Sequence, residues 1–187
     1  MDDKYKELET DNLILRKVLS TDAIDLWENI FNNFENYKYY YPLEFIKQEE
    51  YSRLVFSYKE RYRRGNYFRW GIVLKETNKL VGMINLHTPD YINNKILIGY
   101  IMMNKYKNNG IATEAAQRVL RFVFEDLNMH RLEAHVVDVN IPSERILQKI
   151  GMNLESLQKE TYKLYNEYLD EKVYVILEHE YKNNKKI

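Results

Sequence analysis

Apolar and polar residues alternate along several stretches of the chain, and each alternation predicts a strand with one buried face. The first lies at residues 12–18, and three more follow in close succession, joined by segments rich in turn-forming residues. Those three strands predict an antiparallel meander. The strands expected over the whole chain are 12–18, 66–75, 79–87, 95–103, 131–139, 152–163 and 168–180.

Other stretches repeat their apolar residues every three or four positions, which is typical of a helix with one buried face. Ile24, Trp27 and Ile30 share such a face. The last of these helices has Pro142 near its start and Gly151 just past its end, where each residue suits the helix geometry. The helices expected are 20–31, 47–64, one that follows Gly110 and ends near Asn128, and 142–150.

The order of these elements predicts the fold class. A strand, a long helix and a second strand follow one another over residues 95–139, which calls for a parallel pairing with a right-handed crossover. Together with the meander, this predicts an α/β (α+β) fold with one mixed, mostly antiparallel sheet of about seven strands and helices on both faces. No repeat or interdomain linker interrupts residues 1–187, so we expect a single domain with a frayed tail at 182–187.

Composition narrows the possible partners. With 187 residues, of which 45% are apolar and 14% aromatic, the chain can bury one sizeable core. Lys and Arg number 28, as do Asp and Glu, and this balance argues against a nucleic-acid partner or an acidic membrane. No run is typical of a signal peptide or a bilayer span, and there is no cysteine, so we expect a cytoplasmic protein without disulfides. No spacing of His and carboxylate residues suggests a metal site.

The stretch "NKYKNNGIATEAAQ", residues 104–117, passes from a turn-forming half into a helix-forming half. The first N–H groups of a helix have no partner inside the helix, so such a junction can bind an anion, and Gly110 allows a ligand to approach closely. From these few residues alone, an ordinary turn that caps an ordinary helix is the favoured interpretation.

Several linked segments in the same order resemble the GNAT superfamily of acetyl-CoA-dependent N-acetyltransferases, and within it the RimJ/RimL-type ribosomal-protein N-terminal acetyltransferases. They are "LETDNLILRKVLSTDA", "IGYIMMNKYKNNGIATEA", "FVFEDLNMHRLEAHVVDVNIPSERILQKIGM" and "YLDEKVYVI". The resemblance implies the GNAT fold, with a sheet splayed between strands 95–103 and 131–139. It also implies direct transfer of an acetyl group from acetyl-CoA to a primary amine, the N-terminal α-amine of a protein or peptide, and it admits a homodimer. A polyamine and an antibiotic amine remain alternative acceptors. A non-catalytic acyl-CoA-binding protein of the same fold remains an alternative function.

The resemblance also implies which residues bind acetyl-CoA. The pyrophosphate loop of the family maps onto Lys107, Asn108, Asn109, Gly110, Ile111 and Ala112, and its N–H groups extend to Thr113. Lysine replaces the usual Arg or Gln at the first position, which keeps a cation but loses a bidentate donor. Ile101, Met102 and Met103 would offer main-chain groups to the pantetheine arm, with an N–H near Met102 or Met103 for the oxyanion. Asn140 and Ser143 match residues that contact the cofactor arm, although both could simply cap a helix.

Two familiar proton-handling residues of the superfamily are absent, because Leu147 replaces a tyrosine and Leu97 replaces a glutamate. Ser143 remains for the sulfur. For the amine, Glu160, His87 or a water held by carbonyl groups remains, with Glu160 the leading candidate. A strand-end His is more often an ordinary surface residue, however, and a strand Glu is more often solvated or ion-paired.

Family analogy places the acceptor near the connector 32–45 and the loop 87–94. The connector carries aromatic faces beside carboxylates, which suit a cationic amine. The candidate residues are Glu35, Tyr39, Tyr40, Tyr41 and Glu44. The chain has 17 tyrosines, so these tyrosines could also just cover the core. A rival interpretation, an RNA-binding module built on "RYRRGNYFRW" at 61–70, is weaker, because a helix C-terminus favours cations for its own reasons.

Overall fold

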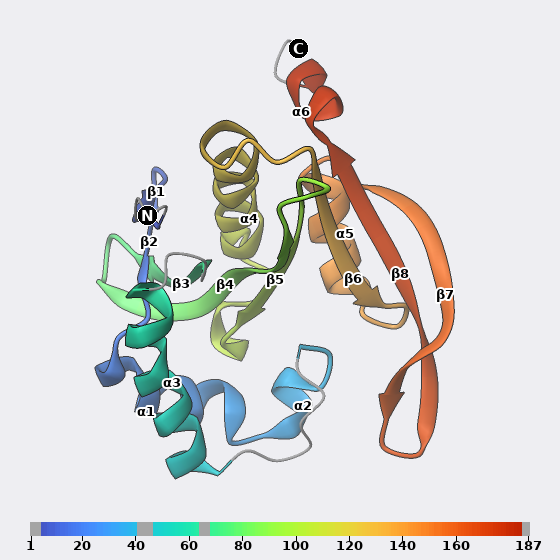
Figure 1. Ribbon diagram of the computed structural model, residues 1–187. Helices are drawn as coiled ribbons and strands as arrows, with labels where there is room; N and C mark the ends of the chain where they lie inside the picture. Colours follow the sequence, from blue (N-terminus) through green and yellow to red (C-terminus); the bar gives the residue numbers. More distant parts are fainter. Residues whose placement is uncertain (1–4, 41–46, 64–67, 185–187) are drawn as a thin grey trace.

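The computed structural model describes residues 5–40, 47–63 and 68–184, and these form one sheet with helices on both faces (Figure 1). The eight strands lie in the order β1-β2-β3-β4-β5-β6-β8-β7, and only β5 and β6 are parallel neighbours. The strands are β1 Leu8–Glu9, β2 Leu13–Lys17, β3 Phe68–Leu74, β4 Lys79–Asp90, β5 Lys95–Met102, β6 Arg131–Val137, β7 Asn153–Leu164 and β8 Glu167–Leu177. The expected mixed, mostly antiparallel sheet is confirmed, with one strand more than predicted.

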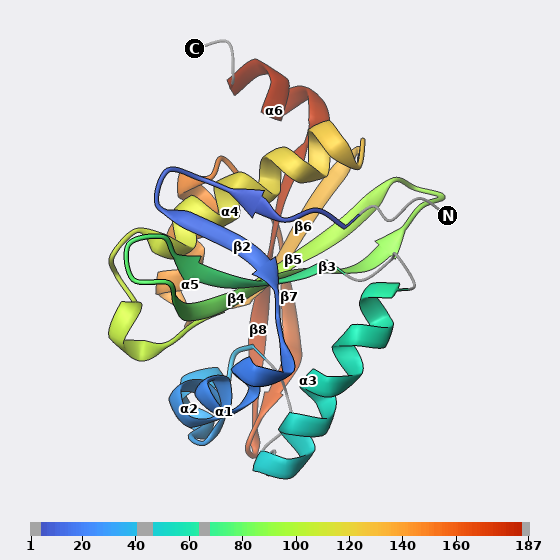
Figure 2. The same ribbon diagram turned by 90° about the vertical axis from the view of Figure 1, so that its left-hand side faces the viewer.

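Helices cover the two faces of the sheet in two groups (Figures 1 and 2). On one face the buried side chains of β3 to β6 pack with those of the fourth and fifth α-helices. On the other face the buried side chains of β3 to β5 pack with those of the first three. The central strands are therefore apolar at most positions. The α-helices are α1 Ala23–Leu26, α2 Phe34–Tyr37, α3 Gln48–Arg63, α4 Ile111–Arg121, α5 Ile141–Lys149 and α6 Glu178–Asn184.

The long helix expected after Gly110 is present as α4, which a π-helical turn at Phe122–Asp126 extends. Its buried face is rich in alanine, including Ala112, Ala115 and Ala116. Small side chains let the helix axis lie close to the sheet, so α4 places its first turn beside the end of β5. This contact fixes the loop that the sequence singled out.

The strands β5 and β6 separate soon after they start. Three parallel pairs join the two strands: Lys95 with Arg131, the next residue of β5 with the next residue of β6, and Leu97 with Glu133. Beyond this last pair, β5 continues to Met102 and β6 to Val137 without further pairing to each other. The expected splay of the sheet is thus present, and it leaves main-chain groups of both strands unpaired on the facing edges.

Two short helices were outside the sequence prediction. Helix α2 has four residues, too few to show a period, and α6 lacks an apolar repeat. Because α6 begins at Glu178, the strand expected at 168–180 ends at Leu177. Residues 182–184 of the tail expected to be frayed belong to this helix.

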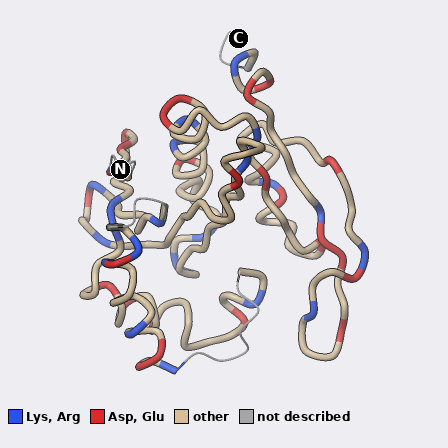
Figure 3. Tube along the Cα trace, in the orientation of Figure 1, with Lys and Arg blue, Asp and Glu red and all other residues tan. Residues whose placement is uncertain are grey.

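Charged residues of both signs are interspersed over the fold (Figure 3). Within the described part of the chain, no helix combines the length and apolar character needed to cross a membrane. Arg69, from the stretch considered for RNA binding, lies in β3 and donates a hydrogen bond to the Tyr58 hydroxyl at 2.7 Å. Arg69 therefore lies within the sheet and contacts α3, whereas an RNA-binding patch would need its basic side chains on the surface.

Candidate functional site

The free edge of β5 presents a specific set of main-chain groups. The Met103 N–H donates to the Val81 carbonyl at 2.9 Å, so this group is already used by β4. Main-chain groups alternate in direction along an antiparallel strand, so those of Ile101 also point to β4, and those of Tyr100 and Met102 point away from it. Of the three residues expected to bind the cofactor here, Met102 therefore offers its N–H to the separation between β5 and β6.

The loop at 107–113 follows directly and forms a turn with two left-handed residues. Asn108 has a φ of 64° and Gly110 a φ of 79°. Gly110 occupies the N-cap of α4, and no side chain caps this helix end. A Cβ placed on Gly110 would meet no atom within 4 Å. The first N–H groups of α4 thus have no side-chain cap, and there is open space at Gly110, an arrangement that suits a phosphate.

A cavity of about 500 Å³ continues from this loop along α4. Its lining combines cationic side chains of α4 and α5 with the turn between β1 and β2. The lining residues are Thr10, Asp11, Asn12, Gly110, Thr113, Glu114, Gln117, Arg118, Arg121 and Lys149. Sequence reasoning missed the cavity, because its walls come from three separate segments. Lys107 lies beside this region, and desolvation lowers the pKa of its ammonium group.

Ser143 and Asn140 lie at the start of α5. The Ser143 hydroxyl lies 3.0 Å from the Tyr100 hydroxyl, which also donates to the Ser143 carbonyl at 3.1 Å. Burial raises the pKa of Tyr100 far above its ordinary range, so this phenol stays protonated. Asn140 is the N-cap residue of α5, but its side chain makes no capping hydrogen bond. Side-chain capping, the alternative role, is therefore not seen for Asn140, and the Ser143 hydroxyl instead links α5 to β5.

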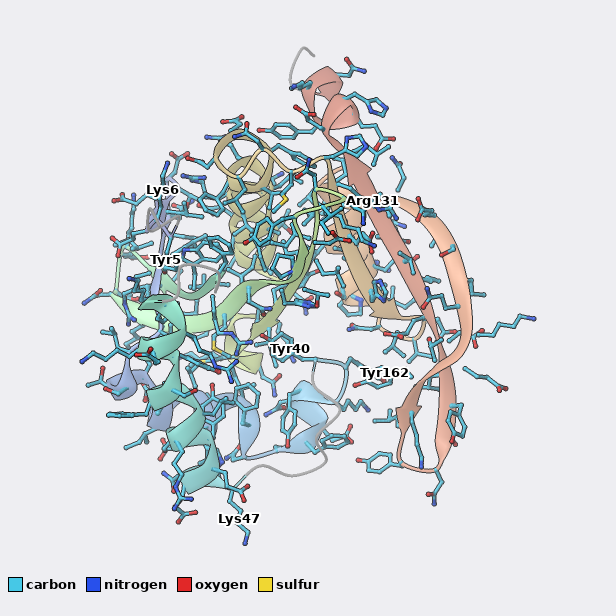
Figure 4. All side chains as sticks on the ribbon, in the orientation of Figure 1. Tyr5, Lys6, Tyr40, Lys47, Arg131 and Tyr162 are labelled. Carbon is cyan, nitrogen blue, oxygen red and sulfur yellow. The ribbon has the colours of Figure 1, made fainter. Side chains whose placement is uncertain are left out.

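On the opposite face of the sheet, side chains from two elements converge on Gly99. A Cβ at Gly99 would lie 3.7 Å from Asn85 Oδ1, 3.7 Å from His87 Nε2 and 3.8 Å from Tyr40 Cε2. The Tyr40 hydroxyl donates to Asn85 Oδ1 at 2.6 Å. Figure 4 shows Tyr40 where α2 faces the sheet. The structure thus brings together two predicted residues, His87 and Tyr40, and adds Asn85, whose role the sequence did not suggest.

The environment of His87 favours its neutral form. Desolvation lowers the pKa of His87, and the positive charges of Arg69 and His135 lower it further. Its Nδ1 lies 3.1 Å from the Thr88 hydroxyl. When Nδ1 carries the proton and donates to Thr88, Nε2 is left as an acceptor beside Gly99.

The carboxylate of Glu35 is already engaged. It accepts hydrogen bonds from Lys38 Nζ at 2.7 Å and from the Tyr165 hydroxyl at 3.1 Å, and these two contacts lower its pKa. The Tyr162 hydroxyl donates to the Lys38 carbonyl (Figure 4). These contacts, here named the α2 clasp, fasten the β7–β8 hairpin to α2. The ring of Tyr39 lies under Lys38 Nζ, 5.1 Å away. Tyr41 and Glu44 lie outside the described residues.

Glu160 lies apart from these groups in the sheet order. It sits in a bulge of the edge strand β7 with a φ of 55°, and its N–H donates to Asp170 Oδ1 at 2.9 Å. Its side chain is exposed. Three strands, β5, β6 and β8, separate β7 from the strand of His87.

Comparisons with known proteins agree with this geometry. A family model described as an acetyltransferase (GNAT) domain matches residues 12–153. The chain is 32% identical to the Bacillus subtilis protein YoaA, described as an uncharacterized N-acetyltransferase, over 82% of this chain and 86% of that protein. It is 24% identical to the Escherichia coli ribosomal protein uS5-alanine N-acetyltransferase, over 82% and 81% respectively. In fold it is similar to the spermidine N-acetyltransferase of Vibrio cholerae, solved with CoA and spermine, at a TM-score of 0.82, 22% identity, and 93% and 100% coverage.

Proposed function

The chain belongs to the GNAT acetyltransferase family and takes its acetyl group from acetyl-CoA, and we propose that it transfers this group directly to the α-amine of a protein or peptide. The convergence of His87, Asn85 and Tyr40 over Gly99 is the observation that carries the proposal. This set of groups lies next to the separation of β5 and β6. We call the face of the sheet that bears it the acceptor face.

The residues of this chain fit acetyl-CoA. The unpaired edge of β5 offers the main-chain groups of Tyr100 and Met102 to an amide-bearing arm, as a neighbouring strand would. The N-terminus of α4 offers N–H groups to a pyrophosphate. The cavity along α4 adds Arg118, Arg121 and Lys149 for the remaining phosphate and the adenosine.

A small set of polar groups can handle the protons. Acetyl-CoA is already an activated thioester, so the protein mainly has to hold the amine beside it and remove a proton from the ammonium. His87 Nε2 is suited to take that proton, since the lowered pKa keeps the imidazole neutral. We place Ser143 at the sulfur, where its hydroxyl, 3.0 Å from that of Tyr100, can donate to the leaving thiolate. Among the predicted bases the geometry favours His87 over Glu160, which stays a prediction without a contact to this region.

Charge favours a peptide over a polyamine, and with it the RimJ/RimL-type interpretation. A polyamine presents several cations, and each needs a carboxylate in a desolvated site. Glu35, the predicted carboxylate within the described connector, is committed to Lys38 and Tyr165 in the α2 clasp. An α-amine presents one cation and loses it on acetylation. The aromatic ring of Tyr40 and the amide of Asn85 suit a peptide end.

The test is release of thiol from acetyl-CoA with a panel of amines. We expect the highest kcat/KM with peptides that begin with Ser or Ala, and none with the same peptides blocked at the α-amine and carrying an internal lysine. Faster turnover of spermidine or an aminoglycoside would replace the peptide assignment with a small-amine acetyltransferase. Tight acetyl-CoA binding without turnover on any amine would overturn the enzymatic proposal in favour of an acyl-CoA-binding protein.

A further inference from the structure

The strand β6 carries a second imidazole on the acceptor face. Leu132, Ala134 and Val136 point into the core beneath α4 and α5. Because side chains alternate along a strand, Glu133 and His135 point to the opposite face, which is the face of His87. None of the acceptor-site predictions made from the sequence included these two residues.

Glu133 is a buried carboxylate with fixed partners. It is 8% exposed, and one of its oxygens lies 2.6 Å from Arg131 Nε and 3.9 Å from Lys95 Nζ. Its second oxygen, Oε2, lies 3.8 Å from His135 Nε2. The imidazole of His135 keeps 34% side-chain exposure. The carboxylate is thus held in place, and the imidazole beside it stays in contact with water.

The strand register puts His135 at the separation of β5 and β6. Glu133 pairs with Leu97, which is the last pair between the two strands. Two residues further along, His135 is on β6 and Gly99 is on β5, at the level where the strands have begun to diverge. His87 Nε2 approaches Gly99 from β4. The two imidazoles therefore lie on the two sides of the separation.

The reaction removes two protons from the acceptor nitrogen. A primary ammonium carries three protons and the amide product carries one, so the nitrogen loses one proton before it attacks the thioester and a second afterwards. The leaving thiolate takes up one proton from the Ser143 hydroxyl, which regains a proton from water. The two protons lost by the nitrogen therefore give a net release of one proton to solvent. A single imidazole on the acceptor face would have to discharge its first proton before it took the second.

Building on the proposed acetyl transfer, we propose that His135, held by Glu133, is the second proton acceptor of the acceptor face. After the new C–N bond has formed, a nitrogen N–H bond breaks, and the proton binds to an imidazole nitrogen of His135. The C–S bond breaks, and its electron pair leaves with the sulfur. The Glu133 carboxylate stabilises the imidazolium, and the exposed side chain passes the proton to water. Glu133 acts through His135 and is a positioning residue.

The test uses His135→Ala in the full-length protein with the best acceptor of the wild-type panel. We expect kcat to fall at least about tenfold, in line with the loss of a proton-transfer group, with the KM for acetyl-CoA and the melting temperature unchanged. Imidazole added to the buffer should restore part of kcat, because the site is open to water. The matched control is His130→Ala, which removes an exposed imidazole at the start of β6 and should retain wild-type kcat.

A second variant, Glu133→Gln, tests the positioning role. Arg131 keeps its two contacts with Glu155, at 2.8 and 2.5 Å, so loss of the Glu133 charge does not leave the guanidinium without a partner. We expect a fall in kcat of about threefold or more with both KM values unchanged. Wild-type kcat in His135→Ala, or a loss that imidazole does not restore, would overturn the inference while turnover by the wild-type protein still supported the acetyltransferase proposal. Absence of turnover in the wild type would instead defeat the proposed function itself.

Discussion

The proposed acetyl-CoA site and the proposed acceptor face of this protein are built from different parts of the polypeptide. On the acetyl-CoA side, the groups that fit the ligand are mostly N–H and C=O groups, at the free edge of β5 and the first turn of α4. On the acceptor face they are side chains from β4 and from the residues after α2, gathered over Gly99. The two sides should therefore respond differently to substitution.

Main-chain recognition tolerates changes of side chain, because every residue except proline supplies the same N–H group. The proposed pyrophosphate loop departs from the family pattern at Lys107 and Asn108, and on this account its main-chain N–H groups can still bind the anion. Side-chain recognition has no such tolerance. Leu147 and Leu97 stand where the superfamily often has a tyrosine and a glutamate, so we propose that other side chains handle the protons.

The largest effect is expected on the acceptor face, for His87→Gln. Glutamine keeps a polar group of similar reach but cannot take a proton, so kcat/KM for the amine should fall by about a hundredfold. The dissociation constant of acetyl-CoA should stay at the wild-type value. Steady-state kinetics and calorimetry measure the two quantities, and His179→Gln, which removes an exposed imidazole on α6, is the control. A fall of less than about threefold would remove His87 from the proton path.

The pH dependence of kcat/KM tests the same role of His87, because the direction of the change can be predicted. His87 must be neutral to accept a proton, so kcat/KM should rise as the pH increases through the pKa of this imidazole. Since desolvation and nearby cations lower that pKa from 6.5, the midpoint of the acidic limb should lie below 6.5. A midpoint above 6.5 in the wild type, or an unchanged limb in His87→Gln, would contradict the assignment.

On the acetyl-CoA side, the sensitive change is one of backbone geometry. Gly110→Val places a β-branched residue at a φ of 79°, which costs about 1–3 kcal/mol if the turn is kept, so the loop should rearrange and misdirect its N–H groups. The dissociation constant of acetyl-CoA should rise about tenfold or more. Gly151→Val imposes a similar strain at a φ of 88° beyond the end of α5, and acetyl-CoA affinity should be unchanged. Equal effects of the two variants would mean that strain alone, and not this loop, controls binding.

A smaller effect is expected for Tyr40→Phe. The substitution removes the 2.6 Å hydrogen bond to Asn85, a residue that is 5% exposed, and a lost hydrogen bond of this kind is worth about 1 kcal/mol. The KM for the amine should rise about fivefold while the KM for acetyl-CoA does not change. Tyr168→Phe, at an exposed tyrosine of the β7–β8 hairpin, is the control. A rise in the KM for acetyl-CoA instead would mean that Tyr40 acts on acetyl-CoA binding and does not belong to the acceptor face.

The same contrast explains how far the sequence alone could go. The loop at 107–113 is one contiguous stretch, and the strands that flank it alternate regularly, so the position of both could be predicted. The short strand β1 and the helix α6 were not, because two residues cannot show an alternation and α6 has no apolar period. The separation of β5 and β6 followed from the family resemblance rather than from any local pattern.

The acceptor face depends on contacts that no local pattern contains. Asn85 meets Gly99 through the register of β4 and β5, and the Tyr40 hydroxyl reaches Asn85 across 45 positions of sequence. The carboxylate of Glu35 is bound by Tyr165, which is 130 positions away. The sequence could propose Glu35 as a site for a cation but could not show that the α2 clasp already supplies one.

The smallest effect is expected for Lys107, although the family pattern places a cation or an amide donor at this first position of the loop. If main-chain N–H groups do most of the binding, Lys107→Gln should raise the dissociation constant of acetyl-CoA by only about threefold, since one exposed ion pair is worth roughly 0–1 kcal/mol. Lys105→Gln, at an exposed neighbour, controls for the general loss of a positive charge. Calorimetry at two salt concentrations separates a direct contact with the pyrophosphate from a general charge effect. Only if Lys107 makes a direct contact should the dissociation constant of its variant still differ from that of the control at high salt. A loss as large as that of Gly110→Val would show that this loop recognises its anion through a side chain, and the contrast with the acceptor face would no longer hold.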